Sequence, residues 1–148
     1  MKKSMVLFDT NILVYSQDID DPRYTFCRSL VKQSEQGKIR GVVAVQNLIE
    51  FTAVMLNLAK IKGKSETKGI VRSLKSFKSG IFSIIYPSDN ALILYGELLE
   101  KYYTTSYRVY DIFLAATMLG NGINQIYTYN VDDFAAFPKI RAIHPENM

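Results

Sequence analysis

Oxygen-bearing side chains recur at four places along the chain, and carboxylates predominate among them. Each place follows or begins a short apolar run, where a buried element would deliver a polar side chain to its edge. The residues are Asp9 and Asn11, then Glu50, then Asp111, and finally Thr128, Asn130, Asp132 and Asp133. Two carboxylates about 4 Å apart repel by about 4 kcal/mol at an effective dielectric constant of about 20. A cluster of three therefore takes up protons or binds a cation.

The small number of cysteine and histidine residues limits the chemistry that such a cluster can support. Oxygen ligands favour hard ions, so the expected cofactor is Mg²⁺ or Mn²⁺, which activates water against phosphate esters. One cysteine, Cys27, and one histidine, His144, argue against a multi-cysteine zinc site and a paired-histidine ribonuclease mechanism. No GxxxxGKS/T motif occurs, and no GxGxxG motif follows the first apolar run, so hydrolysis of nucleoside triphosphates has no support.

Each acidic residue also has a purely structural interpretation. Asp9 and Asp111 are favourable N-caps for the helices that would follow them. Glu50 can be a solvated residue on an amphipathic helix, and Asp132 and Asp133 suit a polar turn. Taken one by one these alternatives stay open; the conjunction of all four places favours a site.

The elements that must position these residues alternate along the chain. Short apolar runs predict strands at residues 5–8, 41–45, 81–86, 123–128 and 140–144. Helical spacing predicts helices at residues 22–36, 46–61, 65–78, 88–103 and 111–119, with Ser65 and Ser88 as N-caps. Alternating strands and helices imply right-handed crossovers, hence an α/β fold in which a central parallel sheet lies between two helical layers. In such a sheet, polar residues after the first and fourth strands lie on one edge.

Length and composition are those of one globular domain spanning residues 1–148. The chain is 48% hydrophobic and carries a formal net charge of +4. No apolar run approaches the roughly 20 residues of a membrane span, and the first apolar run is too short for a signal peptide, so we expect a cytoplasmic protein without a membrane partner.

Positive charge concentrates between residues 60 and 78. Lys68, Arg72 and Lys75 are spaced to share one helix face, which predicts either a surface for RNA phosphates or a solvated face. Four tyrosines precede Asp111 and could stack bases, pack a dimer interface or fill the core; they are Tyr102, Tyr103, Tyr107 and Tyr110.

The sequence resembles the PIN domain family, and within it the VapC-like toxin nucleases, over nearly its whole length. The matching segments are FDTN at residues 8–11, QNLIEF at 46–51, YDIFLAA at 110–116, and IYTYN with DDF at 126–134. The resemblance implies a three-layer α/β/α sandwich with Rossmann-like topology. It also implies an acidic pocket with one or two Mg²⁺ or Mn²⁺ ions that cleaves RNA.

By motif position, Asp9, Glu50 and Asp111 match the first three acids of the family, and the fourth acidic position falls on Asn130. We expect Asp9 and Asp111 to ligate the metal, and Glu50 to ligate it or to orient water. Asp132 or Asp133 could supply the charge that Asn130 lacks, with Asp132 as a fourth ligand. Asn11 and Thr128 match residues that support the pocket.

The leading hypothesis is therefore a metal-dependent endoribonuclease that acts as the toxin of a type II toxin–antitoxin pair. Its expected partners are RNA, a cognate antitoxin and a second copy of the chain. The alternative, which Asn130 motivates, is a non-catalytic PIN-like module that binds RNA or protein.

Overall fold

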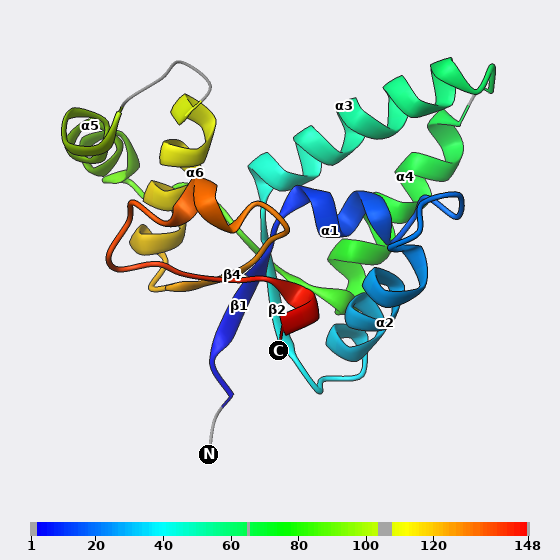
Figure 1. Ribbon diagram of the computed structural model, residues 1–148, viewed down its shortest axis with the longest axis horizontal. Coiled ribbons are helices and arrows are strands. Elements are labelled where there is room, and N and C mark those ends of the chain that lie inside the picture. The colour runs from blue at the N-terminus through cyan, green and yellow to red at the C-terminus, as the bar shows by residue number, and fades with distance from the viewer. Residues whose placement is uncertain (1–2, 65, 104–107, 148) are drawn as a thin grey trace.

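Five parallel strands form one sheet at the centre of the molecule (Figure 1). The computed structural model describes residues 3–64, 66–103 and 108–147. The strands are β1 (Met5–Phe8), β2 (Arg40–Ala44), β3 (Ser83–Ile85), β4 (Gln125–Tyr127) and β5 (Arg141–Ile143). Their order is β3-β2-β1-β4-β5, and Leu7 and Phe8 of β1 pair with Ile126 and Tyr127 of β4. The predicted parallel α/β fold is confirmed, and the ends of β1 and β4 are neighbours.

Helices cover both faces of this sheet. The first group is α1 (Thr10–Tyr15), α2 (Tyr24–Glu35), α3 (Val45–Ile61) and α4 (Thr67–Ser76), and the second is α5 (Ala91–Tyr102) and α6 (Arg108–Gly120). Because side chains alternate along a strand, Val6 and Phe8 pack with the first group, while Leu7 packs with α6. Figure 1 shows the two groups on opposite sides of β1. The three-layer arrangement is therefore established by two separate cores.

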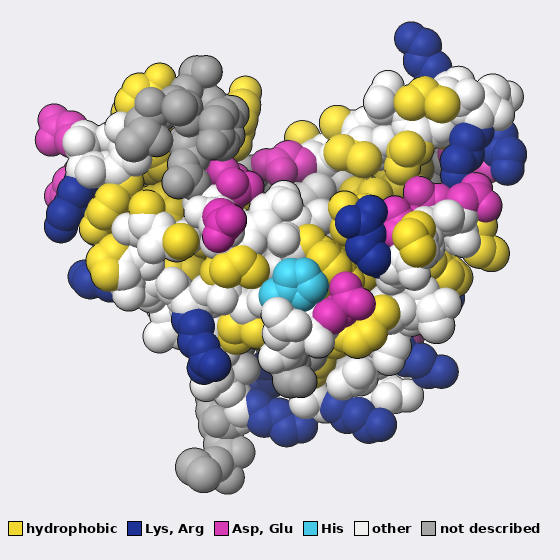
Figure 2. All heavy atoms as spheres, viewed as in Figure 1, with side chains coloured by type: hydrophobic (Ala, Val, Ile, Leu, Met, Phe, Trp, Pro, Cys, Tyr) yellow, Lys and Arg dark blue, Asp and Glu magenta, His cyan; other side chains and the backbone are white. Residues whose placement is uncertain are grey.

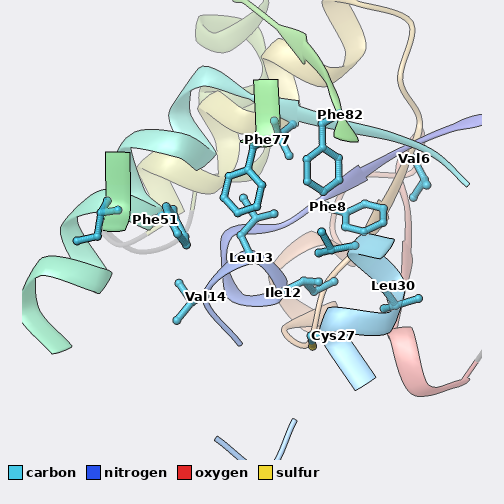
Figure 3. Packing of buried hydrophobic residues seen from close by; sticks show 13 residues of the cluster. Val6, Phe8, Ile12, Leu13, Val14, Cys27, Leu30, Phe51, Phe77 and Phe82 are labelled. Carbon is cyan, nitrogen blue, oxygen red and sulfur yellow. The ribbon is translucent and has the colours of Figure 1, made fainter. Parts of the chain in front are cut away.

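The first core is built around a row of aromatic rings (Figure 3). Phe8 packs edge-on against Phe82 with ring centroids 4.9 Å apart, and Phe82 and Phe51 each contact Phe77. These rings come from β1, from α3 and from the segment between α4 and β3. They join the strand that ends at Asp9 to the helix that carries Glu50, so both residues have rigid supports.

Several predicted boundaries differ in the structure. The last predicted helix begins at Arg108, not at Asp111, so Asp111 is in the first turn and is not an N-cap. Asn90, not Ser88, precedes the first residue of α5, although the Ser88 carbonyl accepts from Ala91 N. Ser65 lies outside the described residues.

The connection from α4 to β3 also departs from the prediction. After Ser76 the chain forms a wide turn (Phe77–Ile81), in which Gly80 has a φ of 107° and Phe82 N donates to Phe77 O. This left-handed position suits glycine. It shortens the predicted strand at residues 81–86 to β3, because Ile81 belongs to the turn.

Short 3₁₀ turns follow the last two strands. They are η2 (Val131–Phe134) and η3 (Pro145–Asn147). In the described part of the chain, no helix has the length and apolarity to cross a bilayer.

Candidate active site

Asp9 lies at the carboxyl end of β1 and holds two structural hydrogen bonds. Its Oδ1 accepts from Thr10 N at 2.8 Å, which caps α1, and its Oδ2 accepts from the Thr128 hydroxyl at 2.7 Å. Burial above all, with the charges of Glu50 and Asp133, raises the pKa of Asp9 to about 6, although the hydrogen bonds from Thr128 and Thr10 act to lower it. Asp9 is thus both the N-cap that the sequence allowed and a carboxylate whose pKa is affected by the charges of two others.

Thr128 organises the polar groups that follow β4. Its side chain is fully buried, and its Oγ1 accepts from Asn11 Nδ2 at 3.3 Å and from Asn130 N at 3.0 Å while donating to Asp9. Asn11 Oδ1 in turn accepts from Tyr129 N at 3.5 Å. The two residues predicted to support the pocket therefore lie where they fix the orientation of the Asp9 carboxylate.

Glu50 is connected to the start of α1 through the hydroxyl group of Thr10. Thr10 Oγ1 donates to Glu50 Oε2 at 3.2 Å and accepts from Asn47 Nδ2 at 3.2 Å. Asn47 is fully buried, and its Oδ1 accepts from Ala44 N at the start of α3. Thr10 and Asn47 were not among the predicted site residues. The signal for them was their position, one residue from Asp9 and three from Glu50.

Gln46 joins the two helices that carry the next acidic residues. Its Nε2 donates to Glu50 Oε1 at 2.7 Å and to the carbonyl of Tyr110 at 2.9 Å. Tyr110 precedes Asp111 in the first turn of α6, so this one amide holds that turn against the start of α3. Gln46 Oε1 is buried and accepts no hydrogen bond from the described residues. Gln46, too, was missing from the predicted site.

The residues after Thr128 differ in their exposure to solvent. Asp133 is partly buried and close enough to raise the pKa of Asp9, whereas Asp132 and Asn130 are exposed. Figure 2 shows acidic side chains gathered on this face between the start of α3 and η2. Of the two candidates for the charge that Asn130 lacks, Asp133 is the one with an electrostatic effect on Asp9.

A divalent cation is chemically suited to the carboxylate oxygens of this site, although the described carboxylates are too far apart to enclose an ion by themselves. Among the described residues, no group of three His, Cys, Asp or Glu side chains is close enough to form a metal site by itself. Mg²⁺ is commonly held by one or two carboxylates together with water and substrate phosphate, so a closed cage is unnecessary. Burial and the nearby charges of Glu50 and Asp133 together disfavour the ionised form of Asp9, and a bound cation would favour that form.

An apolar pocket adjoins Glu50. Its volume is about 540 Å³, and it lies between α3, α5 and α6, with Gln46, Glu50, Tyr95 and Phe113 in its lining. Three side chains of this lining are largely exposed: Ile49 at 66%, Leu92 at 74% and Tyr110 at 70%. We call these three residues the apolar mouth.

The other sequence candidates are distributed over the surface and the core. Lys68, Arg72 and Lys75 are exposed on α4, as predicted. Of the tyrosines, Tyr102 packs edge-on against Phe137, whereas Tyr103 is exposed like Tyr110. Tyr107 lies outside the described residues.

His144 and Cys27 both contact Tyr129. The His144 ring packs edge-on against the Tyr129 ring with centroids 4.9 Å apart, and Cys27 Sγ lies 3.4 Å from the Tyr129 hydroxyl. The two residues have these structural contacts rather than positions beside Asp9.

The fold recurs in several solved structures. VapC20 from Mycobacterium tuberculosis, described as a toxin that cleaves the sarcin–ricin loop, is 16% identical with a TM-score of 0.67 over 90% of this chain and 95% of its own. DNA-bound VapBC from Salmonella typhimurium is 17% identical with a TM-score of 0.66, covering 96% and 98%. A toxin–antitoxin complex from Klebsiella pneumoniae is 22% identical with a TM-score of 0.60, covering 97% and 99%. These likenesses are of fold.

Family membership is established by sequence. Comparison with curated proteins gives no match. The model of the PIN domain, however, matches residues 6–140 and so includes Asp9, Glu50, Asp111 and the segment after β4. With the parallel sheet, the two helical layers and the polar residues at its edge, this match shows that the chain belongs to the PIN domain family.

Proposed function

We propose that this protein is a Mg²⁺- or Mn²⁺-dependent endoribonuclease and the toxin of a type II toxin–antitoxin pair. The observation that carries the proposal is Asp9, a carboxylate fixed by Thr10 N and Thr128 Oγ1 beside Glu50. The family match supports a nuclease, and the toxin–antitoxin complexes that share the fold support an antitoxin partner.

In this proposal Asp9 and Asp111 hold one or two ions, with Glu50 as a further ligand or as the group that orients water. Asp133 contributes negative charge beside Asp9, and the more exposed Asp132 is the alternative ligand. When bound, the cation lowers the pKa of water and stabilises charge on the phosphate. Asn11, Thr128 and Gln46 fix the orientation of these carboxylates, and Asn130 contributes its backbone N–H to Thr128.

In this proposal two exposed surfaces bind partners: the lysines and arginine of α4, and the apolar mouth. Lys68, Arg72 and Lys75 contact RNA phosphates. The apolar mouth is covered by a second copy of the chain, because three large exposed apolar side chains around one pocket are typical of an interaction surface. The antitoxin binds this dimer.

The test is cleavage of RNA by the purified chain. We expect cleavage in Mg²⁺ or Mn²⁺ that stops when EDTA is added, and its loss in Asp9→Asn and Asp111→Asn. Circular dichroism should show that both variants keep the fold. Full activity of both variants would overturn the proposal.

The alternative is a PIN-like module that binds RNA or protein without cutting it. Asn130 at the fourth acidic position and the open arrangement of carboxylates among the described residues motivate it. Mn²⁺ discriminates the two, because a ligand that binds only the folded state at 100 times its Kd stabilises it by about 2.7 kcal/mol. An unchanged melting temperature in Mn²⁺, with RNA bound intact, would favour the alternative.

A further inference from the structure

We propose that the groove between α2 and the α4–β3 turn binds the phosphate backbone of an RNA strand, at a second contact away from Asp9. This inference rests on RNA as the substrate of the proposed function. The groove has a volume of about 390 Å³ and is lined by α2 on one side and by the end of α4 and the following turn on the other. We call it the α2–α4 groove.

The α2 wall carries two cations in a row. Arg28 and Lys32 both line the groove, are exposed and are four positions apart. Residues four apart lie on the same face of a helix, here about 6 Å apart along its axis. That distance is on the scale of a nucleotide step, so the pair can contact neighbouring phosphates of one strand.

The opposite wall supplies hydroxyl groups. Ser73 and Ser76 line the groove, and Ser73 Oγ donates to Gln17 Oε1 at 3.1 Å. Lys68, Arg72 and Lys75 are exposed on the same helix but do not line the groove.

These cations are available to a ligand. The ion pairs within the described residues join Arg23 to Asp21 and Lys62 to Asp18 and Asp20, so Arg28 and Lys32 are outside them. Glu35 is the single acid in the lining. Two positive charges in the lining against one negative charge favour an anionic ligand.

The rest of the lining favours a sugar–phosphate chain. The groove is also lined by Val31, Phe77 and Ile81 from its two walls, and the first two are buried. Ile81 is partly exposed and offers apolar surface to a ribose beside the cations and hydroxyls. Contacts of this kind position a strand without reading its bases. The predicted role is therefore to raise affinity for long RNA.

The experiment measures RNA binding with cleavage prevented. A labelled single-stranded RNA of about 16 nucleotides is titrated into the Asp9→Asn chain by fluorescence anisotropy, between about 50 and 200 mM salt. The groove variant adds Arg28→Gln and Lys32→Gln. The control variant adds Lys101→Gln and Lys139→Gln, two exposed lysines outside the lining of the groove, so the change in net charge is the same.

We expect the groove variant to bind several-fold more weakly at low salt, with a slope of log affinity against log salt shallower by about 1.4, since each single-strand phosphate contact contributes about 0.7. The control should match the parent. Equal weakening in both variants, or no RNA binding by the parent, would overturn the groove. Polyglutamate and unlabelled RNA are also compared as competitors of the labelled RNA. If polyglutamate displaces it at the lower concentration, the groove binds an acidic protein segment and the proposal is overturned.

Cleavage by the chain with native Asp9 separates this inference from the proposed activity. RNA binding through the groove by a chain that never cleaves would support the groove and remove the nuclease. Cleavage that proceeds equally in the groove and control variants, with equal binding, would leave the nuclease and remove the groove.

Discussion

At the scale of the residue, Asp9 combines capping with charge. Its two oxygens are committed to Thr10 N and Thr128 Oγ1, so its position is fixed before any ligand arrives. The neighbours that raise its pKa, Glu50 and Asp133, are the ones that would share a cation with it. The ionised form of Asp9 therefore destabilises the folded protein in the absence of a cation.

This destabilisation predicts an unusual dependence of stability on pH. The pKa of Asp9 rises from 3.8 to about 6 on folding, so the folded state binds its proton more tightly. The free energy of unfolding should carry a contribution that is present below pH 4, falls as the pH rises to 6 and is absent above, about 3 kcal/mol in all.

Urea denaturation of native and Asp9→Asn chains at several pH values, without divalent ions, isolates this contribution as the difference between them. At low pH the variant should be less stable than the native chain, because its amide N–H would face Thr128 Oγ1, which already accepts two hydrogen bonds. The difference should shrink as the pH rises, since only the native chain loses the contribution of Asp9. Parallel pH profiles would contradict the assignment.

Gln46 offers a second test at this scale. Gln46→Ala removes the amide that holds Glu50 and the carbonyl of Tyr110 together. We expect RNA cleavage to fall about tenfold, as for residues that orient metal ligands. Loss of hydrogen bonds worth about 1 kcal/mol each is partly offset by removal of a buried unpaired oxygen, so the melting temperature changes little. Asn57→Ala, at an exposed position on the same helix, is the control and should cleave RNA normally.

At the scale of the element, periodicity was enough to predict every strand and every long helix. It could not predict where α6 begins, because Arg108, Val109 and Tyr110 carry no cap signal and Asp111 carries a good one. It could also not find Thr10, Asn47 or Gln46. Their roles depend on which helices the sheet brings together, and that information is in the tertiary structure rather than in local spacing. Asp9 was predictable because it follows a strand that an apolar run identifies, whereas Asn11 and Thr128 were singled out by their match to motif positions of the PIN family.

The contact between β2 and α2 gives a prediction about packing. A Cβ on Gly41 would collide with Ser34 Oγ and with the Phe82 ring, 2.8 Å away. Gly41→Ala should lower the free energy of unfolding by about 1–3 kcal/mol, the usual cost of overpacking.

Gly96→Ala is the matched control for Gly41→Ala, since the same methyl group on α5 would meet no atom within 4 Å. Helix propensity should make that variant up to about 1 kcal/mol more stable. The two variants are compared by urea denaturation. A Gly41→Ala chain as stable as the native protein would show that β2 and α2 separate more readily than their contacts indicate.

At the scale of the whole molecule, the apolar mouth and Glu50 border the same pocket. The pocket bordered by the apolar mouth is also lined by Glu50, so whatever covers it lies beside the carboxylates. Leu92→Glu would bring a charge into that surface at a position that is 74% exposed. We expect light scattering after gel filtration to give a dimer for the native chain and a monomer for this variant.

Ile19→Glu provides the control for Leu92→Glu, because Ile19 is also 74% exposed but lies between α1 and α2. That variant should remain dimeric. A native chain that is monomeric at all concentrations would remove the second copy as the partner of the apolar mouth.

The order of the strands has a consequence for the synthesis of this protein. Asp9 precedes Tyr127 and Thr128 in the chain, but β1 lies between β2 and β4, and Asp9 N donates to the carbonyl of Tyr127. The hydroxyl that orients its carboxylate follows one residue later, at Thr128. Synthesis proceeds from the N-terminus, so the site cannot close until β4 and Thr128 have been made. A nascent chain that ends before β4 would carry the acidic residue and lack the hydroxyl that orients it.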